Sequence, residues 1–388
     1  MNSSMGIRQP VATLLMPIQK EEKITDVIIR LGGDGIMKCY QCGSCTAICP
    51  ISEDYLISFR RSIKYAQLGL DKKISSDLTP WLCYACGECS NSCPRDANPS
   101  ELMMTLRRYL TMVYDWTGIS KLLYLNNKIL LFAILSLSIL TGIIIYLFHG
   151  PIILDQVALA VFAPIEIVEN AGRLIFAVLA SILLINIYRM YRLTSNLKVK
   201  LPLLIYVREF FKTLIPNFLT QKLFSYCNDR KYWLVHLLIF YGYVASLVLF
   251  ELLLVFTHTN DPFLFVSPLS IIGLFSVFTI AYGGLTVISG RIKKNKPLWK
   301  YSHPTDWMFI ILLVLISITG LLTGIFRSIG WPIGTYVVFS LHLMVVVPFL
   351  ILGVPFTKWA HIAYRPIALY FSKINEIRQS KITEVTKI

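Results

Sequence analysis

The chain has 388 residues, of which 55% are hydrophobic and 15% are charged, and its mean hydropathy is +0.62. This composition excludes an ordinary soluble globular domain. The net charge of +15 suits a membrane surface or a nucleic acid, but no nucleic-acid recognition motif is present, and we expect no nucleic acid as a partner. Nearly all the cysteines precede residue 94, and nearly all the long apolar runs follow residue 128. The sequence therefore predicts a cysteine-rich module followed by a membrane module.

The N-terminal region contains a short apolar stretch, Val11–Met16, without the small-residue cleavage pattern that follows a secretory signal. We therefore expect the cysteine-rich module to stay in the cytoplasm, where thiols are kept reduced. Regularly spaced cysteines in that compartment indicate metal binding rather than disulfides.

Two cysteine runs share the pattern C-x2-C-x2-C-x3-C-P, which is the spacing of two-cluster ferredoxins. In such runs the fourth cysteine binds the cluster of the other run. We predict one [4Fe–4S] cluster on Cys39, Cys42, Cys45 and Cys93, and a second on Cys83, Cys86, Cys89 and Cys49. A pair of structural zinc sites is the alternative, but tetrahedral zinc does not require a doubled run that ends in Cys-Pro.

The segment between the two runs has Ile57, Ile63, Ala66 and Leu68 near helical spacing, with Gly69 as a stop signal. This spacing predicts that the module, residues 1–115, is mostly helical. From about residue 23 to residue 108, the motifs CYQCGSCTAICP, FRRSIKYAQLGL, WLCYACGECSNSCP and LRRYL resemble the C subunit of heterodisulfide reductases. The resemblance implies an electron relay through two clusters to a separate cysteine-rich catalytic subunit. Iron–sulfur subunits of succinate dehydrogenases share a related helical domain.

The second module, residues 116–375, contains apolar runs of the length that a helix needs to cross a bilayer of about 30 Å. We predict six spans, at about 129–148, 168–188, 232–257, 264–289, 306–326 and 335–357, and a cytoplasmic tail at 376–388. Arginine and lysine concentrate in alternate connections, which places both termini in the cytoplasm of a multi-pass protein of the cell membrane. The predicted fold class of the whole chain is all-α.

All six histidines lie in or beside predicted spans. His342 and His361 fall at the two ends of the last span, and His236 and His258 near the two ends of the third. These two spans run antiparallel, so we expect His236 to face His361 and His258 to face His342, each pair holding a haem b. Histidines inside a membrane generally serve a function; the remaining two are expected to be interfacial.

Residues 225–375 also resemble a known family. The segment SLHLMVVVPFLILGVPFTKWAHIAYRP is similar to the last span of the respiratory nitrate reductase gamma subunit, to which the E subunit of heterodisulfide reductases is related. TDWMFIILLVLISITGLLTG and KYWLVHLLIFYGY resemble two further helices of that family, the second through His236. The resemblance implies a di-haem cytochrome b that exchanges electrons with quinol. Ser246 stands where the family has a histidine, so either His258 replaces that ligand or the outer haem is missing.

Two other side chains stand out. Glu251, in the outer half of the third span, is a candidate proton acceptor beside a quinol site, with a snorkelling interfacial acid as the alternative. Cys227 stands apart from both cysteine runs and is expected to be a buried or idle thiol.

The sequence as a whole predicts a membrane-anchored electron-transfer subunit of an oxidoreductase complex, with no catalytic residues of its own. Electrons would pass between the quinone pool and a cytoplasmic partner that resembles heterodisulfide reductase catalytic subunits, through haem b and two [4Fe–4S] clusters. Two alternatives are an anchor of a succinate or fumarate reductase-like complex, and a haem-free membrane iron–sulfur sensor or transporter.

Overall fold

The computed structural model describes residues 23–385 except 196–198, 228–229 and 262–264. The apolar stretch Val11–Met16 and the first 22 residues of the predicted N-terminal module lie outside the described residues. The described residues contain helices and no strands, which confirms the all-α prediction. Among these described residues, six helices are long and apolar enough to cross a membrane, as predicted.

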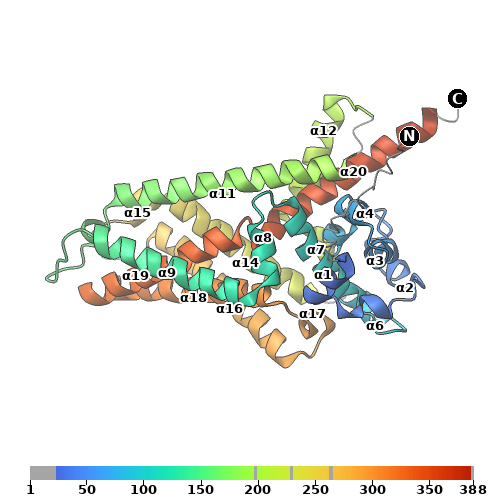
Figure 1. The fold of residues 1–388 in the computed structure, drawn as a ribbon. Helices are drawn as coiled ribbons and strands as arrows, with labels where there is room; N and C mark the ends of the chain where they lie inside the picture. The colour runs from blue at the N-terminus through green and yellow to red at the C-terminus, as the bar shows by residue number, and fades with distance from the viewer. Residues whose placement is uncertain (1–22, 196–198, 228–229, 262–264, 386–388) are drawn as a thin grey trace, which may run out of the picture.

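The cysteine-rich module consists mainly of short helices (Figure 1). They are α1 (Ile24–Arg30), η1 (Asp34–Lys38), α2 (Ser44–Ala47), α3 (Phe59–Gln67), α4 (Asp71–Ser75), α5 (Thr79–Leu82), α6 (Glu88–Asn91) and α7 (Pro99–Tyr114). The side chain of Ser58 caps α3, and Gly69, with a φ of +66°, follows its end. Of the four apolar residues expected on one helix face, Ile63 and Ala66 are buried in α3. Ile57 precedes the helix, and Leu68 is 60% exposed.

The membrane module is built around the six long helices. They are α9 (Asn127–Phe148), α11 (Ile165–Thr194), α14 (Arg230–Glu251), α16 (Pro268–Lys293), α18 (Pro304–Ser328) and α19 (Pro332–Pro348), the last continued by a π-helical turn, η4 (Phe349–Gly353). Proline opens α16, α18 and α19, where its missing N–H has no partner to lose. Helix α14 packs on α16, α16 on α18, α18 on α19, and α19 on α9, and α11 lies along α14 and α7.

Shorter elements connect the long helices. They are α8 (Ile119–Leu125), α10 (Leu159–Phe162), α12 (Leu203–Glu209), η2 (Phe210–Leu214), α13 (Ile215–Leu219), η3 (Lys222–Tyr226), α15 (Leu254–Thr257), α17 (Pro297–Lys300), η5 (Lys358–Ala360) and α20 (His361–Val385). Helix α20 runs through the segment predicted as a tail.

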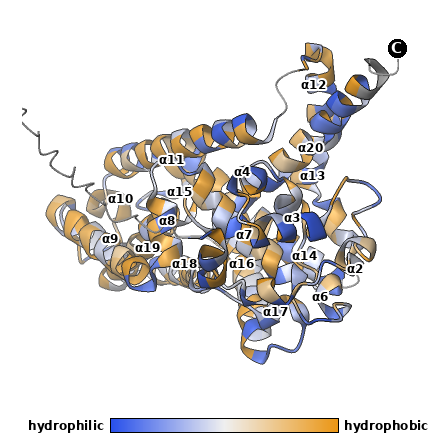
Figure 2. Ribbon diagram, turned by 45° about the vertical axis from the view of Figure 1, so that its right-hand side comes forward, coloured by the Kyte–Doolittle hydropathy of each residue, from blue (hydrophilic) through white to orange (hydrophobic). Residues whose placement is uncertain are grey.

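The outer surface of the long helices is apolar. Figure 2 shows α9, α11 and α19 mostly in the hydrophobic colour, whereas α3 and α4 are largely hydrophilic. On α9, Phe132 is 72% exposed and Tyr146 is 76% exposed, and the buried residues of this helix are Leu130 and Thr141. Apolar exposure on this scale is unfavourable in water and suits a hydrocarbon environment.

Two spans end earlier than predicted. Helix α14 stops at Glu251 and a separate turn, α15, follows, whereas the sequence predicted one span to residue 257. The last span ends at Gly353 rather than 357, because Pro355 has no amide hydrogen to continue a helix. His361 therefore begins a new helix, α20, and does not share one continuous helix with His342.

The two modules share one hydrophobic core. Trp81 and Leu82 of the cysteine-rich module belong to the same buried cluster as Phe224, which precedes α14, and Tyr364 of α20. The rings of Trp81 and Tyr364 lie 5.0 Å apart. Helix α5 packs on α20 and α6 on α17, so the cysteine loops lie against one end of the helical bundle (Figure 1).

Candidate metal and haem sites

The two cysteine loops have the same backbone conformation. Gln41 and Ala85, which follow the first cysteine of each run by two residues, have φ values of 62° and 55°. Gly43 and Gly87 have φ values of 91° and 90°, and the short helices α2 and α6 begin directly after them. This left-handed conformation favours glycine. The sequence repeat is therefore also a structural repeat.

The last cysteine of each run lies with the other run. Cys39 interacts electrostatically with Cys93 as well as with Cys42. Cys49 interacts in the same way with Cys83 and Cys86. These are the neighbours that the predicted exchange of fourth ligands requires.

The thiols are held in surroundings that suit metal-bound sulfur. Burial raises the pKa of Cys49 to about 11, so without a metal this group is a neutral thiol, and a bound cation would offset the cost of the thiolate. The amide of Ala85 donates to Cys83 Sγ at 3.3 Å, and the amide of Ala97 donates to Cys93 Sγ at 3.4 Å. Such donors stabilise thiolate ligands.

No three His, Cys, Asp or Glu side chains in the described ranges converge on one point that a single metal ion would occupy. In a [4Fe–4S] cubane each thiolate binds a different iron, so its four sulfur ligands do not meet at one point. The donor set and the loop conformation therefore fit two cubane clusters.

The two loops differ in exposure. Cys42 in the first loop is exposed, and it is accompanied by exposed Met37 and Tyr40, at 67% and 68%. The second loop faces the membrane module: a Cβ on Gly87 would lie 2.5 Å from Cβ of Pro297 in α17. One loop is thus accessible from outside, and the other is covered by the helical bundle.

Cys227 is buried, but it is not isolated. Its thiol lies close to that of Cys86, and the interaction between the two lowers the pKa of Cys86. The expectation of a buried thiol is confirmed, and this thiol has a cysteine neighbour. No local pattern links the two positions, because one lies in the second cysteine run and the other lies after η3.

His236 of α14 and His361 of α20 lie side by side, as the sequence predicted. Their ring centroids are 5.9 Å apart and the ring planes are inclined by 70°. His236 Nδ1 lies 2.6 Å from Oε1 of Gln221, and His361 Nδ1 bonds the carbonyl of Lys358. Each Nδ1 is therefore occupied, which leaves Nε2 as the nitrogen for a metal.

This pair fits a haem iron held between two histidines. Imidazole nitrogens bind transition metals at about 2 Å, and the ring separation is compatible with one ion between the two rings. Burial holds the pKa of His361 well below its usual value, so this side chain is neutral and can act as a ligand.

The structure does not bring the two outer histidines together in the same way. His342 Nδ1 lies 2.9 Å from Oγ1 of Thr319, and a Cβ on the neighbouring Gly320 would lie 3.3 Å from Cε1 of the ring. His258 bonds the carbonyl of Ala163 through Nε2 at 2.7 Å, and its ring lies 5.6 Å from Phe339. Within the described part of the chain, His258 and His342 make no ring contact with each other.

The remaining sequence candidates lie at helix ends. His303 caps α18, where its Nδ1 accepts from the amide of Thr305 at 3.3 Å. His149 stacks on Phe162 at 5.4 Å. Glu251 is the last residue of α14, is partly exposed, and interacts electrostatically with Arg173 of α11.

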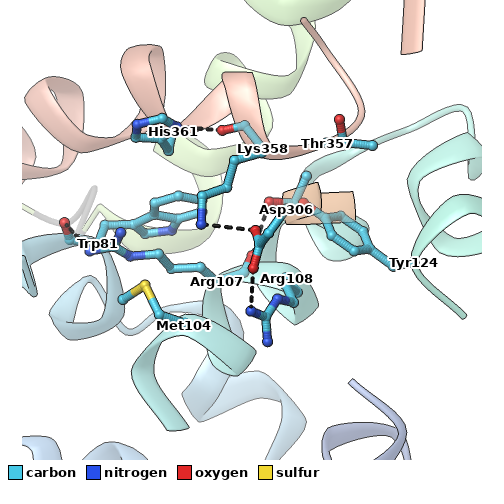
Figure 3. Close-up of a pocket in the computed structure, with 10 residues that line it drawn as sticks. Trp81, Met104, Arg107, Arg108, Tyr124, Asp306, Thr357, Lys358 and His361 are labelled. Carbon is cyan, nitrogen blue, oxygen red and sulfur yellow. Dashed lines mark hydrogen bonds and ion pairs between the residues drawn. The ribbon is translucent and has the colours of Figure 1, made fainter. Parts of the chain in front are cut away.

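A polar cavity lies between His361 and the cysteine-rich module, and sequence reasoning missed it (Figure 3). Asp306 of α18 bonds Nη2 of Arg108 at 2.9 Å and Nζ of Lys358 at 2.9 Å. Nη1 of Arg108 also lies 2.8 Å from Oε1 of Glu101. Asp306 and Arg108 are 5% and 6% exposed at the side chain, so a buried ion network joins the two modules.

Two further arginines tie the second cysteine loop to the region of His361. Arg107 donates to the carbonyls of Pro80, at 2.6 Å, and Cys83. Burial lowers the pKa of Arg107 to about 9, so it stays cationic at neutral pH. Arg365, one turn after His361, donates to the carbonyl of Trp81 at 3.2 Å, and its guanidinium lies 3.5 Å above the ring of Tyr84.

The fold and the cysteine loops define a multi-span membrane protein with an iron–sulfur domain, and the comparisons with known proteins agree. The family described as "4Fe-4S dicluster domain" matches residues 35–97. This match supports [4Fe–4S] clusters in the cysteine-rich module. No solved structure matches the chain.

The curated relatives are described as C subunits of heterodisulfide reductases or as similar to such a subunit. A protein of Archaeoglobus profundus, described as similar to the C subunit of heterodisulfide reductase, is 37% identical over 98 residues, which are 24% of this chain and 50% of that protein. The C subunit of the H(2):CoB-CoM heterodisulfide,ferredoxin reductase of Methanothermobacter marburgensis is 37% identical over 87 residues, which are 22% of this chain and 47% of that protein. The chain thus spans about half the length of these relatives.

Proposed function

We propose that this chain is a membrane-anchored subunit that relays electrons between a membrane quinone or quinol and a cytoplasmic heterodisulfide reductase-like catalytic partner. The proposed carriers are haem b, on His236 and His361, and the two [4Fe–4S] clusters on the assigned cysteines. When bound, these groups supply one-electron chemistry. The protein supplies the ligands, their spacing and the exclusion of water.

The observation that carries the proposal is the short connection between the histidine pair and the second cysteine loop. The ring of Phe224 lies 5.7 Å from that of His236 and 5.4 Å from that of Tyr84, which stands between Cys83 and Cys86. A metal on His236 and a cluster on the second loop would therefore share one packed aromatic neighbour. Gln221, in the same segment, fixes the orientation of His236.

The catalytic partner is proposed to bind at the first cysteine loop. Cys42 is exposed there, and the same module presents further exposed apolar side chains, among them Met37, Tyr40 and Leu56. Arg95 lies 4.1 Å above the ring of Tyr40 and donates to its hydroxyl at 3.0 Å. Aromatic and arginine side chains of this kind are enriched at protein interfaces.

The carrier is proposed to react near the far end of the bundle. His342 is the outer ligand with an anchored ring, because Thr319 holds its Nδ1. We retain His258 as the second outer ligand; it would have to release the carbonyl of Ala163 to present Nε2. Glu251 is the proposed proton acceptor on that side.

The test is an optical redox titration of the anaerobically purified protein, with His361→Ala and, as a matched interfacial control, His149→Ala. We expect a haem b spectrum that His361→Ala reduces and His149→Ala preserves. Unchanged haem content in His361→Ala rejects the ligand assignment. Broad iron–sulfur absorption without haem in the unaltered protein would favour a sensor or transporter. Co-purification with a flavoprotein instead of a cysteine-rich protein would favour a succinate or fumarate reductase-like anchor.

A further inference from the structure

Arg107 and Arg365 are two cations without an acidic partner. In the part of the chain that the structure describes, no carboxylate lies within ion-pair distance of either guanidinium. The neighbouring Arg108, in contrast, is paired with both Glu101 and Asp306. The partners of Arg107 and Arg365 are backbone carbonyls and an aromatic face, which satisfy N–H groups but carry no net negative charge.

The two cations also lie close to each other. Arg107 and Arg365 interact electrostatically, and both interact with Cys83. Nη2 of Arg365 is buried and has no hydrogen-bond partner. Two like charges and an unsatisfied buried donor at one place are unfavourable unless an anion is also bound there.

A [4Fe–4S] cluster on four thiolates is such an anion, and it gains one further negative charge when it accepts an electron. We infer that Arg107 and Arg365 compensate the negative charge of the cluster on Cys83, Cys86, Cys89 and Cys49. They thereby raise the reduction potential of that cluster. This inference rests on the second cluster of the proposed function.

The location gives this charge pair a role in the relay. Arg365 interacts electrostatically with His361 and His236 on one side, and it stacks on Tyr84 of the cysteine loop on the other. A higher reduction potential at the second cluster favours an electron on that cluster over one at the histidine pair. The first cluster, near solvent, has no equivalent enclosed pair among the described residues: Arg60, which packs beside Gly43, is exposed.

The experiment is a potentiometric EPR titration of the full-length protein and of the variants Arg107→Gln, Arg365→Gln, Arg365→Lys and Arg60→Gln. We expect each of the first two to lower the midpoint potential of one cluster. At a fixed applied potential, the ratio of reduced to oxidised cluster should fall at least about tenfold. This corresponds to a shift of the midpoint potential by about 59 mV for a one-electron couple. Arg365→Lys keeps the charge and should retain most of the potential. Arg60→Gln is screened by solvent and should leave both clusters unchanged.

Three results would overturn the inference. One is an unchanged cluster potential in both glutamine variants. Another is an equal shift in Arg365→Lys, because hydrogen-bond geometry rather than charge would then be responsible. The third is a shift of the haem potential alone, which would assign the arginines to a haem carboxylate instead. Cluster signals that are present but do not move reject only this inference, whereas an unaltered protein without cluster signals rejects the proposed function as well.

Discussion

The buried ion network between the modules makes a quantitative prediction. Asp306→Asn keeps the shape of the side chain but removes the negative charge that Arg108 and Lys358 both contact at 2.9 Å. Removing one partner of a buried ion pair costs about 3–5 kcal/mol. Because Arg108 retains Glu101 at 2.8 Å, we expect the lower end of this range, about 3 kcal/mol. At about 2 °C per kcal/mol for a large domain, the unfolding temperature should fall by about 6 °C.

The assay is thermal unfolding of the detergent-purified protein, followed by tryptophan fluorescence. The matched control is Glu376→Gln, which breaks the pair of Lys373 and Glu376, 2.8 Å long but 38% and 42% exposed at the side chains. An exposed pair contributes less than about 1 kcal/mol, so the control should unfold close to the unaltered protein. Combining Asp306→Leu with Lys358→Met should recover much of the loss, because Lys358 is then not left without its ion partner and Arg108 keeps Glu101.

The reasoning is refuted if Asp306→Asn unfolds within about 2 °C of the unaltered protein, which corresponds to about 1 kcal/mol. The network would then behave as a solvent-screened surface pair, and it would not hold the cysteine-rich module against the bundle.

Three further predictions concern the cysteine loops and a helix cap. Burial lowers the pKa of His303 to about 4 in the folded protein, whereas the value in the unfolded chain is about 6.5. As the pH falls from about 6.5 towards 4, the unfolded chain binds a proton that the folded protein does not, so the free energy of unfolding falls by about 1.4 kcal/mol per pH unit. His303→Asn keeps a capping acceptor and should flatten the pH dependence of the unfolding temperature; an unaltered slope would contradict this. Cys49→Ser should abolish the same EPR signal as Cys83→Ser, and loss of the signal that belongs to the first motif would disprove the exchanged ligands. Gly87→Ala should reduce cluster content more than Gly43→Ala. Both residues have φ near 90°, but only the added methyl at Gly87 would meet a proline ring atom, at 2.5 Å; equal losses would speak against this contact.

Local spacing was enough to predict much of the cysteine-rich module. The cysteine runs, their glycines and the helix around Ile63 and Ala66 are set by residues close together in sequence. The start of that helix was not predicted correctly. Ile57 lies before the helix, because Ser58 caps its first turn. A capping serine outweighs apolar periodicity in deciding where a helix begins.

Apolar length likewise predicted the six spans, but it could not locate the breaks within them. Pro355 ends the last span in the structure, although the surrounding residues remain apolar enough to extend it. The separation of His342 and His361 onto different helices follows from that one residue. The pairing of His236 with His361 was nevertheless predicted, because the third and last spans were expected to run antiparallel, which brings the start of one beside the end of the other.

Contacts between distant segments left no local signal. Cys227 interacts with Cys86, and Arg108 with Asp306, only because the cysteine-rich module packs against one end of the helical bundle. In the sequence, a charged residue at the start of a membrane helix indicates an ordinary helix cap, and Asp306 does take part in the cap of α18. Its second role, as an ion partner of the other module, depends on tertiary packing.

Metal analysis of the intact, anaerobically purified protein tests the central claim most directly. The account predicts about eight non-haem iron atoms per chain, from two [4Fe–4S] clusters, together with at least one haem b in the same sample. A sample that contains zinc on the cysteines, or no iron at all, would contradict the account.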